Sequence, residues 1–110
     1  MKLLHLDIPT EQKIEGKTYT YVERIKLHVT NPDEHAYKLQ FVCAEPDSPL
    51  PEIVKTQRHL SIRVADIDEE IALFDEIVFP PVKINETLRI GFALKEGVLF
   101  ELMEVSQPSN

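Results

Sequence analysis

Apolar and polar residues alternate with a period of two along much of this chain, which is the pattern of half-buried β-strands. The alternation is clearest in residues 19–29, where aliphatic side chains interleave with charged ones. A turn-forming stretch at 31–34 follows, and residues 37–44 form the next apolar run, so a hairpin is predicted. Further strands are predicted at 2–8, 59–64, 77–79, 88–94 and 98–105.

One helix is predicted, and it begins after Asp66. This residue suits a helix N-cap, and acidic residues fill the first turn. Ile71 and Phe74 share one face, which predicts a helix of about ten residues. Prolines make residues 45–51 a loop and are expected to break the chain at 80–81, while the C-terminal tail is expected to fray. A strand-rich chain with few helices on one face predicts an α+β fold.

The two halves of the chain echo each other. The sequence HLDI at 5–8 returns as HLSI at 59–62, and such repeats indicate repeated architecture. Late in each half a strand carries one polar residue among apolar ones, Gln40 in the first half and Glu101 in the second. Because side chains alternate along a strand, the polar residues of each histidine-bearing strand share one face, opposite the apolar row. These polar faces would suit a wet, concave pocket.

Glu101 is the most unusual of these residues, because its strand is apolar on both faces. A carboxylate buried there costs several kcal/mol unless it is paired or coordinates a metal. Two imidazoles, one amide oxygen and one carboxylate together would satisfy a divalent ion. The site would keep one net positive charge, which favours an oxyanion or enolate. The candidate ligands are His5, Gln40, His59 and Glu101.

Composition and charge narrow the possible functions. The chain has 110 residues and a net charge of -7, and it lacks a Lys/Arg cluster, so neither nucleic acid nor an anionic membrane is an expected partner. Its length predicts one domain, residues 1–110. The one cysteine, Cys43, fits a reducing compartment, and the N-terminus does not read as a signal peptide. We therefore expect a soluble, cytoplasmic protein.

Several segments in the last two thirds of the chain resemble the vicinal-oxygen-chelate superfamily in their order. They are 45–50, 58–69 with the predicted helix after it, 88–92 and 97–102. This superfamily includes glyoxalase I, methylmalonyl-CoA epimerase, extradiol dioxygenases, and bleomycin- and fosfomycin-resistance proteins. The resemblance implies a glyoxalase-like fold, in which paired βαβββ modules form a curved mixed sheet around a metal. Here residues 1–50 would be a truncated first module, and residues 57–106 a complete second one.

The resemblance also implies roles for individual residues. His59 takes the place of the histidine ligand that opens the second module, and Glu101 the place of the ligand in its last strand. Gln40 and His5 take the corresponding places in the first module, with His28 as the alternative to His5. Glu101 could also act as a general base. Two arginines that could bind an anionic substrate, or be paired in salt bridges, are Arg63 and Arg89.

The implied activity is that of a lyase or isomerase that uses one divalent ion (Zn, Ni, Co, Mn or Fe). It would act on a small carbonyl or hydroxy substrate through a metal-stabilised oxyanion. An epimerase fits less well, because neutral Gln40 cannot be a second base. Two alternatives stay open: an Fe(II) dioxygenase-like enzyme using His5, His59 and Glu101, and a non-catalytic small-molecule-binding protein of the resistance type. A homodimer is expected, since edge strands need covering.

Overall fold

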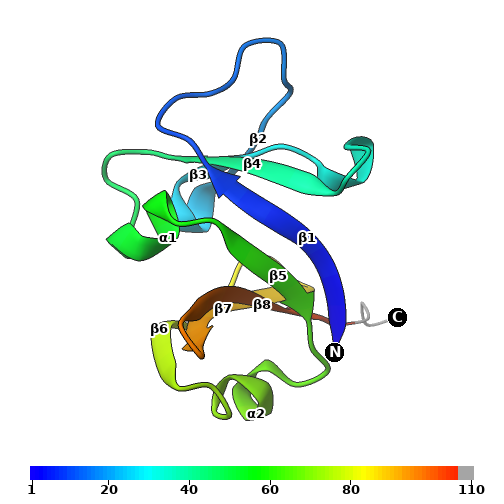
Figure 1. Ribbon diagram of the computed structural model, residues 1–110, viewed down its shortest axis with the longest axis vertical. Helices are drawn as coiled ribbons and strands as arrows, with labels where there is room; N and C mark the ends of the chain where they lie inside the picture. The colour runs from blue at the N-terminus through cyan, green and yellow to red at the C-terminus, as the bar shows by residue number, and fades with distance from the viewer. Residues whose placement is uncertain (107–110) are drawn as a thin grey trace. The chain divides into compact units, whose positions relative to one another are not determined.

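The computed structural model in Figure 1 describes residues 1–106; the end of the tail, where fraying was expected, lies outside these residues. The described chain is strand-rich with few helices, so the predicted α+β class is confirmed. Its helices are too short and too polar to cross a bilayer. The strands are β1 (Lys2–Pro9), β2 (Thr20–Val22), β3 (Leu27–Val29), β4 (Leu39–Ala44), β5 (His59–Arg63), β6 (Glu76–Lys83), β7 (Leu88–Lys95) and β8 (Val98–Val105).

The chain divides into two compact units. The N-terminal unit is His5–His59, and the C-terminal unit is Met1–Leu4 together with the described chain from Leu60 onward. In the N-terminal unit the strands lie in the order β2-β3-β4-β1, with β1 parallel to β4 and the other neighbours antiparallel. In the C-terminal unit the order is β5-β8-β7-β6, and β5 is parallel to β8. The first strand of each unit therefore pairs with the last one, in the same sense.

The two units also share a register. Asp7 on β1 pairs with Gln40 on β4, and Ser61 on β5 pairs with Glu101 on β8. Asp7 lies two residues after the histidine of the HLDI segment, and Ser61 lies two residues after the histidine of the HLSI segment. Gln40 and Glu101 therefore occupy equivalent places in their units, as the sequence echo suggested.

The core of the C-terminal unit lies under the helix α2 (Ile67–Ile71). Asp66 is its N-cap, as predicted, and accepts a hydrogen bond of 3.1 Å from the backbone N–H of Glu69. Ile67 and Ile71 pack in one cluster with strand residues that include Leu102. The helix has five residues, so the expected length was wrong. It is stabilised by burial of this apolar face rather than by its own length.

The N-terminal unit has no corresponding helix between β1 and β2. Residues 10–19 form the long loop that leaves the end of β1 in Figure 1. The phenol oxygen of Tyr19 accepts a hydrogen bond of 3.0 Å from the backbone N–H of Ile14, which ties the loop to itself. The loop covers its strands less completely than α2 does, since Leu39 and Phe41 are only half-buried.

Other local predictions were wrong. The continuous strand expected over 19–29 is interrupted by a 3-10 turn at Glu23–Ile25, after which Lys26 adopts a left-handed conformation with φ 49°. This break makes β2 and β3 an extra hairpin, in addition to the predicted pairing of β3 with β4. The short helix α1 (Glu52–Thr56) was not predicted, because its five residues are too few for a periodic pattern.

The prolines at 80–81 do not end a strand. They lie inside β6, which pairs only with β7 in the C-terminal unit, and the register shifts between Phe79 and Val82. A strand with a free edge and a bulge tolerates prolines, because their missing N–H groups are not needed for pairing. Gly91 on β7 allows this close approach: a Cβ there would lie 3.2 Å from the carbonyl oxygen of Phe79.

Candidate metal centre

Three buried polar side chains come together in the N-terminal unit. His5 and Asp7 project from the same face of β1, two residues apart, and His59 begins β5. The side chains of Asp7 and His59 are only 2% and 3% exposed, and that of His5 is 8% exposed. The expectation of a wet polar face is therefore wrong for these residues. On β1 the polar row is more buried than the neighbouring Leu6 and Ile8.

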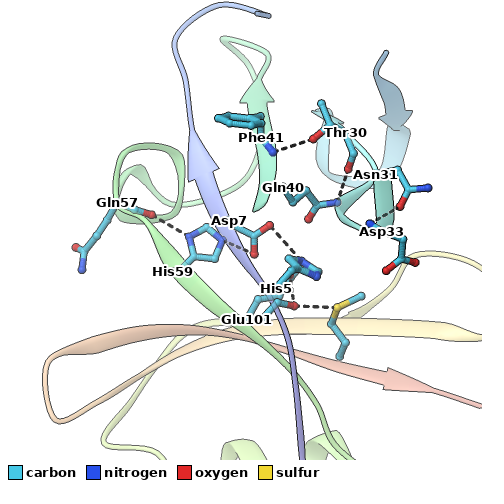
Figure 2. Close-up of polar contacts among 12 residues, drawn as sticks. His5, Asp7, Thr30, Asn31, Asp33, Gln40, Phe41, Gln57, His59 and Glu101 are labelled. Atoms are coloured by element: carbon cyan, nitrogen blue, oxygen red, sulfur yellow. Dashed lines mark hydrogen bonds and ion pairs between the residues drawn. The ribbon is translucent and has the colours of Figure 1, made fainter. Parts of the chain in front are cut away.

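Asp7 lies between the two imidazoles (Figure 2). Its Oδ1 is 3.3 Å from Nε2 of His5, and its Oδ2 is 3.4 Å from Nε2 of His59. A buried carboxylate must be compensated, because its transfer from water costs several kcal/mol. Here the carboxylate of Asp7 faces two imidazoles, and each of them presents its Nε2 atom.

The tautomer of His59 is set by its backbone contact. Nδ1 of His59 lies 2.9 Å from the carbonyl oxygen of Gln57, which can only accept, so Nδ1 carries the proton. Burial lowers the pKa of His59; the hydrogen bond to Gln57 raises it, and the nearby His5 lowers it. The neutral ring is thus favoured, and its unprotonated Nε2 faces the carboxylate of Asp7.

Gln40 lies beside Asp7, its register partner on β4. Its side-chain amide donates a hydrogen bond of 2.9 Å to the backbone carbonyl of Thr30, as Figure 2 shows. That bond identifies which end of the amide is nitrogen. The amide oxygen of Gln40 is therefore the atom that could serve as a ligand.

Glu101 belongs to the C-terminal unit, where it is half-buried. The hydroxyl of Ser61, its register partner, lies 3.0 Å from Oε1 of Glu101 and donates to it. Glu101 is thus held by a neutral donor in its own unit. Its predicted roles as ligand and base stay predictions.

The remaining candidates are placed as follows. Nε2 of His28 lies 2.5 Å from Oε1 of Glu45, and the His28 ring lies against that of Tyr21, tilted by 34°, with centroids 4.6 Å apart. Arg89 donates two hydrogen bonds to Asp68, of 2.9 and 3.1 Å, so it is engaged in an ion pair. Arg63 is exposed, and its guanidinium lies 3.5 Å from the carbonyl oxygen of Val105. The predicted substrate-binding role of the two arginines stays a prediction.

The sequence reasoning did not name Asp7 as a candidate ligand. The pattern that could have found it is its position two residues after His5, which places both side chains on one face of a strand. Asp is also rarely fully buried unless it is paired. What the sequence cannot reveal is that this row, and not the aliphatic one, is the more buried.

Comparisons with known proteins show the fold alone. No protein-family model and no curated protein matches the chain. A solved structure that is similar is "hypothetical protein BH1468" from Bacillus halodurans C-125, with 18% sequence identity and a TM-score of 0.66. The alignment covers 99% of this chain and 97% of that one, so the fold described above occurs in a crystal structure as well.

Proposed function

We propose that the protein binds a divalent metal ion through His5, Asp7 and His59. The observation that carries this proposal is that one buried carboxylate faces the same ring nitrogen of two imidazoles: Oδ1 of Asp7 lies 3.3 Å from Nε2 of His5, and Oδ2 lies 3.4 Å from Nε2 of His59. A buried carboxylate is stabilised when it coordinates a cation, and a neutral imidazole nitrogen can coordinate the same kind of ion.

The chemistry of the donor set supports the same proposal. A neutral imidazole that donates its other N–H to a backbone carbonyl is the usual state of a histidine ligand, and His59 is held in this way by Gln57. Two histidines and one carboxylate suit Zn²⁺, Co²⁺ and Fe²⁺. The amide oxygen of Gln40, beside Asp7, is a further candidate ligand.

The metal-binding proposal is tested by titration. Protein stripped with EDTA should bind one Zn²⁺ or Co²⁺ per chain in calorimetry, and Co²⁺ should give visible absorption bands. Asp7→Asn and His59→Gln should each weaken binding at least about tenfold. His35→Gln is the matched control and should bind as wild type, because His35 lies in the loop after Pro32–Glu34. A wild type that binds no ion, or variants that bind equally well, would contradict the proposal.

The reaction that we propose is that of a glyoxalase-like lyase or isomerase. The repeated strand order of the two units supports a fold of paired βαβββ modules with the first helix missing. A bound divalent ion would supply Lewis-acid stabilisation of an oxyanion on a small carbonyl or hydroxy substrate. The chain's own part is to orient the ligands: Gln57 holds the ring of His59, and Thr30 holds the amide of Gln40.

The enzyme and binding-protein classes differ in turnover. An enzyme of this kind should exchange the proton next to the carbonyl of α-hydroxy ketones with deuterium from solvent, which NMR detects. Glu101→Gln should abolish exchange and keep the metal if Glu101 is a base, or lose both if it is a ligand. Consumption of O₂ by the Fe²⁺ form would instead favour the dioxygenase alternative. Metal binding without exchange or O₂ consumption in a screen of small oxygen-bearing compounds would leave the binding-protein class.

A further inference from the structure

A pocket lies on the other face of the N-terminal sheet. It has a volume of about 230 Å³ and is built on Leu39 and Phe41, whose side chains alternate with Gln40 along β4. Gln40 is on the face of Asp7, so the pocket is separate from the candidate metal centre. Its walls come from the 10–19 loop and from the segment between β3 and β4, through Lys17, Thr30, Asn31, Glu34 and His35.

The pocket exists because the N-terminal unit has a loop where the C-terminal unit has α2. Phe41 and Leu102 occupy equivalent register positions, opposite Ile8 and Ile62. Leu102 is fully buried in the cluster that includes α2, whereas Phe41 is only half-buried. The loop therefore leaves parts of Leu39 and Phe41 uncovered at the bottom of a pocket whose other lining residues are polar or glycine, and a small apolar group could bury these two side chains further.

Two polar side chains that line the pocket, His35 and Asn31, have N–H groups that can donate hydrogen bonds. Nδ1 of His35 accepts a hydrogen bond of 3.0 Å from the backbone N–H of Tyr37, so in the neutral ring Nε2 carries the proton. The side-chain oxygen of Asn31 accepts a hydrogen bond of 2.9 Å from the backbone N–H of Asp33, which leaves the NH₂ group of Asn31 to donate. Both side chains are thus oriented by local backbone bonds.

A cation completes the set of donors. Nζ of Lys17 lies 4.8 Å from the centre of the Phe41 ring, close enough for a cation–π contact that holds the charge over this ring. The hydroxyl of Thr30 accepts a hydrogen bond of 2.9 Å from the backbone N–H of Phe41, so its own hydrogen can be donated. Glu34 is the one acid among the lining residues.

We propose that this pocket binds a small carboxylate that carries a flat apolar group. The apolar group would rest on Phe41 and Leu39, and the carboxylate would accept from Lys17 and its neighbouring donors. Charge-assisted hydrogen bonds of this kind are stronger than neutral ones. The volume is below the usual range for drug-sized ligands, which limits the ligand to about one ring.

Phenylacetate is a suitable probe, with phenylacetamide as its neutral counterpart and benzylamine as a cationic one. In ¹H–¹⁵N correlation spectra, phenylacetate should shift resonances of residues 16–18 and 30–41. It should bind at least about threefold more tightly than the amide. Equal binding of acid and amide, tighter binding of benzylamine, or shifts confined to other residues would overturn the proposal.

Two lysines provide a matched comparison. Lys17→Met should remove the preference for the acid, whereas Lys13→Met should keep it, because Lys13 lies over Tyr19, at 5.8 Å, and does not line the pocket. Glu34→Gln should strengthen phenylacetate binding, because it removes the like charge. The side chains of Lys13, Lys17 and Glu34 are all exposed, so circular dichroism should show an unchanged fold for the three variants. A Lys17→Met variant that keeps the full preference would contradict the proposed role of the cation.

Discussion

The carboxylate of Asp7 lies 3.4 Å from Nε2 of His59, on the side of the ring opposite its hydrogen bond to Gln57. The two residues come from the first strand of the N-terminal unit and from its last residue. A cation bound beside them would be held by the carboxylate of Asp7 and by the neutral Nε2 of His59.

Asp7→Asn should remove the stabilisation that a bound metal gives. The free energies of unfolding of wild type and variant in EDTA provide the metal-free baseline. With free Zn²⁺ at about 100 times its dissociation constant, wild type should gain about 2.7 kcal/mol. Urea unfolding under both conditions measures the effect. An equal gain for the variant would show that Asp7 is not a ligand.

Truncation should cost more under α2 than under the loop. Ile62 and Ile8 occupy equivalent positions, but Ile62 is 4% exposed and belongs to the core cluster, whereas Ile8 is half-buried. We expect Ile62→Ala to lower the free energy of unfolding by about 2–5 kcal/mol, and Ile8→Ala by about half as much. Urea midpoints with unchanged slopes test this; equal costs would mean that the loop packs as well as the helix.

Gly91→Ala should destabilise the C-terminal unit. An added Cβ would lie 3.1 Å from Cδ1 of Ile71, 3.2 Å from the carbonyl oxygen of Phe79 and 3.3 Å from the backbone nitrogen of Pro81. Overpacking of this kind costs about 1–3 kcal/mol. The double variant with Ile71→Val should recover part of the loss, because one of the three contacts is to a side chain that can shrink. Thermal unfolding of the single and double variants provides the comparison.

The ion pair of Asp68 and Arg89 predicts a pH effect at the acid end. Hydrogen bonds from Arg89 lower the pKa of Asp68 below its usual value of 3.8, while desolvation acts in the opposite direction and the charge of Arg89 lowers the pKa further. Because the folded pKa is lower than the unfolded one, the stabilising effect is present above 3.8 and is lost as the pH falls through the lowered pKa. Arg89→Gln should raise the pKa of Asp68 in NMR titrations. An unchanged pKa would mean that the pair is not formed in solution.

Much of the local structure could be predicted because strand periodicity is a local property. The strands around 2–8, 59–64, 88–94 and 98–105 are where alternation and apolar runs indicated. The N-cap at Asp66 was also predictable from local chemistry. The short helix α1 was not, because five residues are too few for a periodic pattern. The break at Lys26 and the passage of β6 through two prolines were also not predictable, because each depends on packing that overrides local preference.

In the candidate metal centre, too, some residues could be predicted from the sequence and others depended on tertiary packing. The sequence identified His5, His59 and Gln40, and in the N-terminal unit each of them lies beside or in contact with Asp7. It did not identify Asp7 itself, because an acidic residue on a half-polar strand looks like a solvated one. Nor did it predict the pocket on Phe41, which depends on how far the 10–19 loop covers its sheet.

By itself, the order of residues determined the α+β class and the echo between the two halves, since both follow from side-chain periodicity and short motifs. Tertiary structure alone decided which face of β1 is buried, and so turned Asp7 toward His5 and His59. The physical reason is that alternation divides a strand into two faces but does not say which face the rest of the chain will cover.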